Sequence, residues 1–216
     1  TSHGMILGET GEKMSKSRGN VVNPDDIVNE YGADTMRMYE MFMGDFEKAA
    51  PWSQSSIKGC KRFLDKIWNL QEIVVDGEEY SADLEVSFNK TIKKVTEDIN
   101  NLGFNTAIAA MMALINEIGA KKAINKAEYR TLLVLLNPFA PHITEEIWEN
   151  MGFGGQIAHT QWPTFDEAKC VEATVEVPVQ INGKIRARIN IALDLSKDDM
   201  LAAAMANDAI KAATEG

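Results

Sequence analysis

One stretch of the sequence, residues 88–102, reads FNKTIKKVTEDINNL and sets the pattern for most of the chain. Its apolar residues recur at steps of three or four, which places them on one face of an α-helix. They are Phe88, Ile92, Val95, Ile99 and Leu102. The same spacing appears earlier in the chain, in Ile57, Cys60, Leu64 and Ile67, with one longer step to Val74. It appears again later, in Phe104, Ile108, Met111, Ile115 and Ile118. We therefore expect amphipathic helices from Ser53 onward.

These helices are predicted to form an antiparallel bundle. The connections between them are short, which favours antiparallel neighbours. Leu132 to Leu136 is apolar on all sides, so we expect its helix in the centre, and Asn125 with Glu128 forms a capping pair at the start of that helix. The fold class is thus mainly α, with a bundle of four or five helices over residues 51–155.

The remaining segments differ from this pattern. Residues 1–50 contain a short strand end, an exposed glycine-rich loop and two helices, the first starting at Asn23-Pro24. Residues 156–170 read as an extended linker. Residues 171–216 alternate apolar and polar side chains around Asn182-Gly183, a hairpin signal, before a helix from Ser196 to Ala213. One hairpin and one helix bury little core, so we expect a truncated α+β domain.

Composition narrows the function. The net charge of −10 argues against non-specific nucleic-acid binding by the whole surface. Positive charge is nevertheless clustered, in three groups: Lys13, Lys16 and Arg18; Lys58, Lys61, Arg62 and Lys66; and Lys184, Arg186 and Arg188. No apolar run approaches the roughly 20 residues of a membrane-spanning helix, so no membrane partner is expected.

The cysteines and histidines suggest no metal site. Cys60 and Cys170 are far apart in the sequence, which gives neither a disulfide framework nor metal-ligand spacing and is typical of the reducing cytosol. We expect both to be small buried residues and the protein to be cytoplasmic. His142, beside Pro141 at a predicted helix start, is expected to have a capping role rather than a catalytic one.

The loop Lys13-Met14-Ser15-Lys16-Ser17-Arg18-Gly19-Asn20 carries the clearest chemical signal. It places three cations, two hydroxyls and a glycine on one exposed segment. Such a set suits the crowded negative charge of a triphosphate, above all as pyrophosphate departs. The alternative is a solvated basic loop without a ligand.

Lys13 to Ser17 is identical to the second signature of the class I aminoacyl-tRNA synthetases. The loop exit from Arg18 to Pro24, Pro51-Trp52, the run from Asn137 to Trp148 and the run from Val179 to Arg186 are similar to the leucine-specific members of that family. The resemblance covers essentially the whole chain. It implies a carboxy-terminal fragment with an anticodon-binding type of bundle, from an enzyme that activates leucine with ATP and transfers it to tRNA(Leu).

The resemblance also implies roles for particular residues. Lys16 and Lys13 would be the catalytic cations, and Lys13, Met14, Ser15, Lys16 and Ser17 would bind ATP, with Mg²⁺ assisting in the parent enzyme. Arg62 and Lys66 on the bundle, and Lys184 and Arg186 near the hairpin, are candidate tRNA contacts, although a solvated helix or strand face explains them as well. No metal-binding residues are expected.

Several alternatives stay open. The chain lacks the first class I signature, a nucleotide-binding sheet, a leucine pocket and an editing domain, so by itself we expect it to be inactive and to bind no cofactor. An isoleucine, valine or methionine enzyme would give an equivalent fragment. A non-catalytic tRNA-binding module and a purely structural helical domain are the remaining readings.

Overall fold

The computed structural model describes residues 3–45, 47–171, 174–181, 184–192, 197–207 and 210. The chain forms two compact units, residues 1–167 and residues 168–216. The boundary between them lies inside the segment expected to be a linker. The described residues include no helix that combines the length and apolarity needed to cross a membrane.

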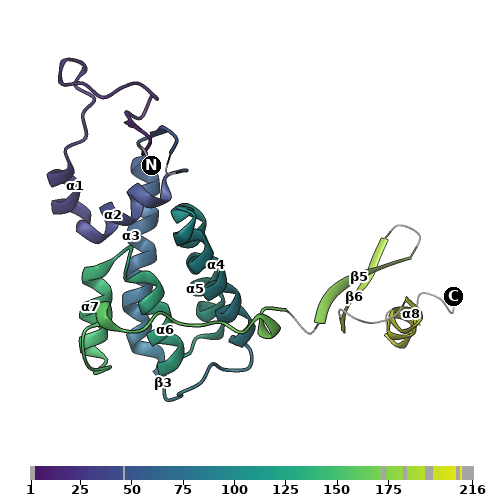
Figure 1. Ribbon diagram of the computed structural model, residues 1–216. Coiled ribbons are helices and arrows are strands. Elements are labelled where there is room, and N and C mark those ends of the chain that lie inside the picture. The colour runs from purple at the N-terminus through teal and green to yellow at the C-terminus, as the bar shows by residue number, and fades with distance from the viewer. Residues whose placement is uncertain are drawn as a thin grey trace. The chain divides into compact units, whose positions relative to one another are not determined.

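A bundle of helices forms most of the first unit (Figure 1). Its members are α3 (Gln54–Asn69), α4 (Glu85–Asn100), α5 (Phe104–Lys121), α6 (Lys126–Leu136) and α7 (Pro141–Asn150). The mainly helical fold predicted from the apolar period is therefore confirmed. Short 3-10 turns occur at η1 (Lys16–Arg18), η2 (Leu70–Ile73), η3 (Ile157–His159) and η4 (Glu167–Lys169).

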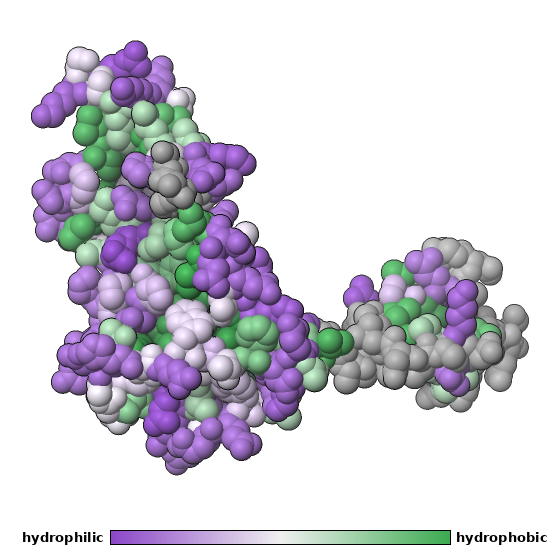
Figure 2. All heavy atoms as spheres, viewed as in Figure 1, coloured by the Kyte–Doolittle hydropathy of each residue, from purple (hydrophilic) through white to green (hydrophobic). Residues whose placement is uncertain are grey.

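The apolar seams of the helices make one continuous core. Phe88, Ile92 and Val95 of α4 are fully buried, as are Leu132 and Leu135 of α6. The central position expected for α6 is confirmed, since its last five residues are all buried. Hydrophilic side chains cover much of the bundle face seen in Figure 2, as expected for helices that turn one apolar face inward.

Side chains cap the helices where the sequence indicated. Asn125 and Glu128 form a reciprocal capping box at α6. The Asn23 side chain accepts a hydrogen bond from the backbone nitrogen of Asp25 at the start of α1 (Pro24–Tyr31). Each cap satisfies backbone donors that the first turn of a helix leaves unpaired.

The helical seam expected to reach Val74 ends earlier. Helix α3 stops at Asn69, and Val74–Val75 forms a short strand, β3, parallel to β4 (Ile124–Asn125). This pairing joins the segment after α3 to the start of α6. The longer apolar step across Gln71 marks the end of the helix.

Residues 156–167 lie on the bundle rather than standing free. Ile157 is buried, the indole nitrogen of Trp162 donates to the Thr96 hydroxyl at 2.8 Å, and the backbone nitrogen of Asp166 donates to the Asn89 side chain at 2.8 Å. Most of the predicted linker is thus attached to the first unit.

The second unit contains an antiparallel hairpin of β5 (Thr174–Ile181) and β6 (Lys184–Ala192), followed by α8 (Lys197–Ala206). The predicted hairpin is confirmed, while its turn residues Asn182 and Gly183, and the cap residue Ser196, lie outside the described residues. The register shifts in β6: Val179 pairs with Ala187 and Gln180 with Ile185. Arg186 is therefore the extra residue of a β-bulge.

Candidate functional site

Two short strands hold the base of the lysine-rich loop. Strand β1 (Ile6–Leu7) runs parallel to β2 (Ala50–Pro51), and the backbone nitrogen of Trp52 donates to the carbonyl of Leu7 at 2.8 Å. Gly4 is required at this close approach, because a Cβ atom there would lie 1.9 Å from the carbonyl oxygen of Lys48. The loop thus leaves a fixed base and returns to it through α1 and α2 (Ala33–Phe42).

Asn20 closes the loop on itself. Its side-chain oxygen accepts a hydrogen bond from the backbone nitrogen of Ser15 at 2.8 Å, and its side-chain nitrogen donates to the carbonyl of Lys13 at 3.4 Å. A Cβ atom on Gly8 would lie 3.1 Å from the same Asn20 nitrogen, so the strand end leaves little spare room there. Sequence reasoning placed Asn20 in the motif but gave it no role.

A turn orders the second half of the loop. Lys16–Arg18 forms η1, and Gly19, with φ of 66°, ends it in the left-handed region that favours glycine. The hydroxyls of Ser15 and Ser17 lie 3.2 Å apart. Met14 is half-buried and packs against the core, whereas Lys13, Lys16 and Ser17 are exposed.

The cations of the loop differ in whether a carboxylate already pairs with them. Arg18 pairs with Glu12, the Nη1 and Oε2 atoms lying 3.2 Å apart. Lys13 and Lys16 are exposed, and neither has an ion-pair partner among the described residues. The structure therefore presents these two predicted cations to solvent, where a polyanion could reach them.

A second basic feature runs along α3. Lys58, Arg62 and Lys66 are exposed and spaced four residues apart, so they follow one side of the helix at intervals of about 6 Å. We call these three residues the α3 basic stripe. Lys61 is excluded from it, since Lys61 forms an ion pair with Asp65.

A groove borders the α3 basic stripe. Arg62 and Lys66 line it together with Gly59, and Met112 and Asn116 of α5 line the other side. Its volume is about 330 Å³. Lys66 Nζ donates to Asn116 Oδ1 at 3.3 Å, and no carboxylate lines this groove in the described part of the chain. Its charge and shape suit a phosphate backbone.

The other candidate residues behave differently. Arg186 is exposed on the hairpin, in the second unit, while the side chain of Lys184 lies outside the description. Cys60 is buried, as expected, but Cys170 is partly exposed, contrary to expectation.

His142 does not cap its own helix; it contacts the Asp34 carboxylate at 2.7 Å. Sequence reasoning missed Asp34, because nothing in a local pattern reveals a partner 108 residues away.

Two family models match parts of this chain. Residues 83–201 match the family described as "Anticodon-binding domain of tRNA ligase", and residues 1–53 match "tRNA synthetases class I (I, L, M and V)". The first match covers more than half of the chain, and the chain therefore belongs to the tRNA ligase anticodon-binding domain family. Along its whole length it is similar to a leucine–tRNA ligase, that of Alkaliphilus oremlandii (strain OhILAs), with 58% identity. The chain spans 27% of that relative.

Two solved structures are similar to this chain. The ternary complex of Agrobacterium radiobacter K84 agnB2 LeuRS with tRNA and LeuAMS matches 99% of this chain and 30% of its own, with 30% identity and a TM-score of 0.75. Mycobacterium tuberculosis methionyl-tRNA synthetase in complex with methionyl-adenylate matches 70% of this chain and 38% of its own, with 18% identity and a TM-score of 0.52. The second likeness concerns the fold alone.

Proposed function

We propose that this chain is the part of a leucine–tRNA ligase that neutralises ATP phosphates with one loop and holds tRNA(Leu) with the helical bundle. The observation that carries the proposal is the pair of exposed lysines, Lys13 and Lys16, on a loop closed by Asn20. Neither lysine has an ion-pair partner in the part of the chain that the structure describes. The 58% identity to a leucine–tRNA ligase over the whole chain supports leucine as the amino acid.

In the parent enzyme the leucine carboxylate attacks the α-phosphorus of ATP. Leucyl-adenylate forms and pyrophosphate leaves, and the leucyl group then passes to the 3′ adenosine of tRNA(Leu) with release of AMP. Negative charge accumulates on the departing phosphates, and the ammonium groups of Lys16 and Lys13 would offset it. Ser15 and Ser17 supply hydroxyl donors beside them.

Mg²⁺ would enter this reaction with the nucleotide. Protein sites for Mg²⁺ in nucleotide chemistry use few side chains and several phosphate oxygens. The described residues contain no group of three or more histidine, cysteine, aspartate or glutamate side chains that could hold a metal ion. The groups that we assign to the nucleotide in this chain are the cations and hydroxyls of the loop.

The α3 basic stripe is the candidate tRNA contact of the bundle. Lysine and arginine side chains at this spacing would meet phosphates and fix the position of the RNA rather than read its bases. Arg186, and Lys184 beside the hairpin turn, are candidates for a second contact.

The parent enzyme would act in the cytosol. The sequence contains only two cysteines, Cys60 and Cys170, and such sparse cysteine usage is typical of proteins in a reducing compartment.

Amino-acid specificity tests this proposal directly. In the full-length protein that contains this chain, we expect ATP–pyrophosphate exchange with leucine and far less with isoleucine, valine or methionine. Exchange that prefers one of those three would assign the chain to another enzyme of the class. The 216-residue chain alone should give no exchange.

Filter binding tests the tRNA role. The 216-residue chain should bind tRNA(Leu), and the affinity should fall steeply as salt rises. The absence of tRNA binding at every salt concentration would instead favour a structural helical domain.

A further inference from the structure

Helix α2 holds the amino-terminal end of α7 through one carboxylate. Asp34 Oδ1 accepts hydrogen bonds from the Nδ1 atom of His142 at 2.7 Å and from its backbone nitrogen at 3.3 Å. Asp34 Oδ2 accepts from the backbone nitrogen of Ile143 at 2.7 Å. The residue before α7 is Ala140, whose side chain has no acceptor. Asp34 therefore supplies from another helix the cap that the local sequence lacks.

The position of Asp34 makes this cap a strong one. The side chain is only 9% exposed, and its negative charge faces the positive end of the α7 dipole. A charged acceptor in such a site forms shorter and stronger hydrogen bonds than a neutral one. The carboxylate thus fixes α2 and α7 in one relative orientation.

The same helix also holds α3. The hydroxyl oxygen of Tyr39 accepts a hydrogen bond from the backbone nitrogen of Ser53, the cap residue of α3, at 2.6 Å. Arg37 Nη2 donates to the carbonyl of Pro138, in the turn between α6 and α7, at 3.1 Å. One short helix therefore contacts the starts of two bundle helices and a bundle turn.

Helix α2 also follows the lysine-rich loop in the chain. Residues 21–32, which include α1, separate α2 from that loop. Helix α3, which carries the α3 basic stripe, begins beside Ser53, whose backbone nitrogen is bonded to Tyr39. Any rotation of α2 would change the separation between Lys16 and Arg62. Under the proposed function, the geometry of α2 would set where bound tRNA lies relative to the nucleotide.

From this arrangement we infer that Asp34 is a positioning residue for the transfer of the aminoacyl group to tRNA. This inference rests on the proposed function. We assign Asp34 no contact with nucleotide or RNA. Its role is to fix the position of the phosphate-binding loop relative to the tRNA-binding bundle. Of these two parts of the chain, activation of the amino acid uses only the loop, whereas transfer to tRNA uses both.

The test uses the full-length enzyme and separates the two steps. Asp34→Ala should lower kcat/KM for tRNA(Leu) aminoacylation by roughly 10- to 100-fold, the loss typical of a reactant displaced by about 1 Å. Leucine-dependent ATP–pyrophosphate exchange should stay within about two-fold of wild type. Asp34→Asn, which keeps one acceptor oxygen, should give an intermediate loss in aminoacylation. Arg37→Ala should reproduce the selective loss in a weaker form.

Asp76→Ala is the matched control, because Asp76 is an exposed carboxylate that pairs with Lys126 on the bundle surface. It should change neither reaction. Equal losses in exchange and aminoacylation for Asp34→Ala, or none in aminoacylation, would overturn the inference. If Asp34→Ala does not fold, Asp34→Asn decides by the same criterion. A wild-type enzyme without leucine-dependent exchange would instead refute the proposed function.

Discussion

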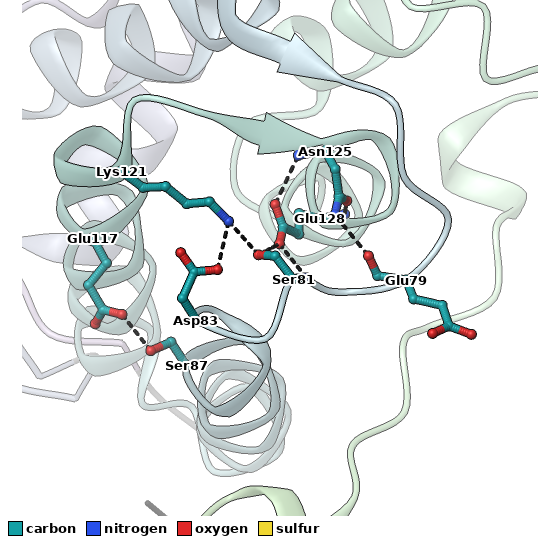
Figure 3. A network of polar contacts seen from close by, with 8 residues as sticks. All are labelled: Glu79, Ser81, Asp83, Ser87, Glu117, Lys121, Asn125 and Glu128. Carbon is teal, nitrogen blue, oxygen red and sulfur yellow. Dashed lines mark hydrogen bonds and ion pairs between the residues drawn. The ribbon is translucent and has the colours of Figure 1, made fainter.

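The buried carboxylate of Glu128 on α6 accepts hydrogen bonds from both the backbone nitrogen and the hydroxyl of Ser81, 47 residues earlier in the chain. Its other oxygen accepts from the backbone nitrogen of Asn125 at 2.9 Å. Glu128 is 0% exposed. Figure 3 shows this carboxylate at the centre of a polar network between α6 and the segment before α4.

Lys121 extends the network. Its ammonium group donates to the Ser81 hydroxyl at 2.6 Å and to Asp83 at 2.7 Å. The network therefore joins the end of α5, the start of α6 and the connection that leads into α4. Three hydrogen bonds from Ser81 and Asn125 thus satisfy the Glu128 carboxylate. A buried charge is tolerated when the protein supplies such donors.

Replacing Glu128 should test the contribution of this network to stability. In Glu128→Gln an amide nitrogen replaces one acceptor oxygen and faces a donor, so one buried donor loses its partner. We expect the free energy of unfolding to fall by about 1–3 kcal/mol, measured by urea denaturation. Glu117→Gln is the control, since Glu117 is exposed and contacts only Ser87 in Figure 3. Equal effects of the two changes would contradict this account.

Removing the ammonium group of Lys16 should slow amino-acid activation. In the full-length enzyme we expect Lys16→Ala to reduce leucine-dependent ATP–pyrophosphate exchange by roughly 100- to 1000-fold, the loss typical of a preorganised transition-state donor. Arg18→Ala should have a smaller effect, because Glu12 already pairs with Arg18. An exchange rate unchanged by Lys16→Ala would remove the catalytic assignment.

Asn20 should matter through the shape of the same loop. Asn20→Ala removes the acceptor of the Ser15 backbone nitrogen and the donor to Lys13, while every cation remains. We expect a loss of exchange activity of about 10-fold, at the low end of what misplacement of a catalytic group costs. The folded fraction, measured by circular dichroism, should not change. Activity equal to wild type would show that Asn20 does not order the loop.

Neutralising the α3 basic stripe should weaken tRNA binding in a salt-dependent way. For the substitutions Lys58→Gln, Arg62→Gln and Lys66→Gln, each lost phosphate contact should lower the slope of log affinity against log salt by about 0.9. Filter binding over a salt series measures this slope. Lys126→Gln is the control, because Asp76 already pairs with Lys126. A triple variant with the wild-type slope would show that tRNA binds elsewhere.

Alkaline pH should lower the free energy of unfolding because Cys60 is buried. Burial raises the pKa of the Cys60 thiol from 9.0 to about 11. Between pH 9 and pH 11 the Cys60 thiol therefore keeps its proton in the folded state but loses it in the unfolded state. The contribution of the buried thiol to the free energy of unfolding is complete below pH 9 and is lost as the pH rises toward 11. The loss should reach about 2 kcal/mol at pH 10.5. It should be absent in Cys60→Ala and present in Cys170→Ala, when unfolding is compared at pH 8 and pH 10.5.

The sequence by itself determined where the bundle helices lie and which side chains cap two of the helices. Apolar spacing of three and four residues identified the bundle, because one face of each helix must leave water. The Asn125–Glu128 capping box and the Asn23 cap were also predictable, since a cap acts within one turn of its own residue. The five residues Lys13 to Ser17 indicated the chemistry of the loop without any structure.

Only the tertiary structure decided which distant residues act together. Asp34 caps a helix that begins 107 positions later in the chain, at Pro141, and Glu128 completes its capping box while also binding Ser81. Local propensity carries no information about such partners, because the hydrogen bond forms only after packing has brought the two segments together. The helices follow from short-range periodicity in the sequence. The contact between α2 and the start of α7 forms only when the core packs.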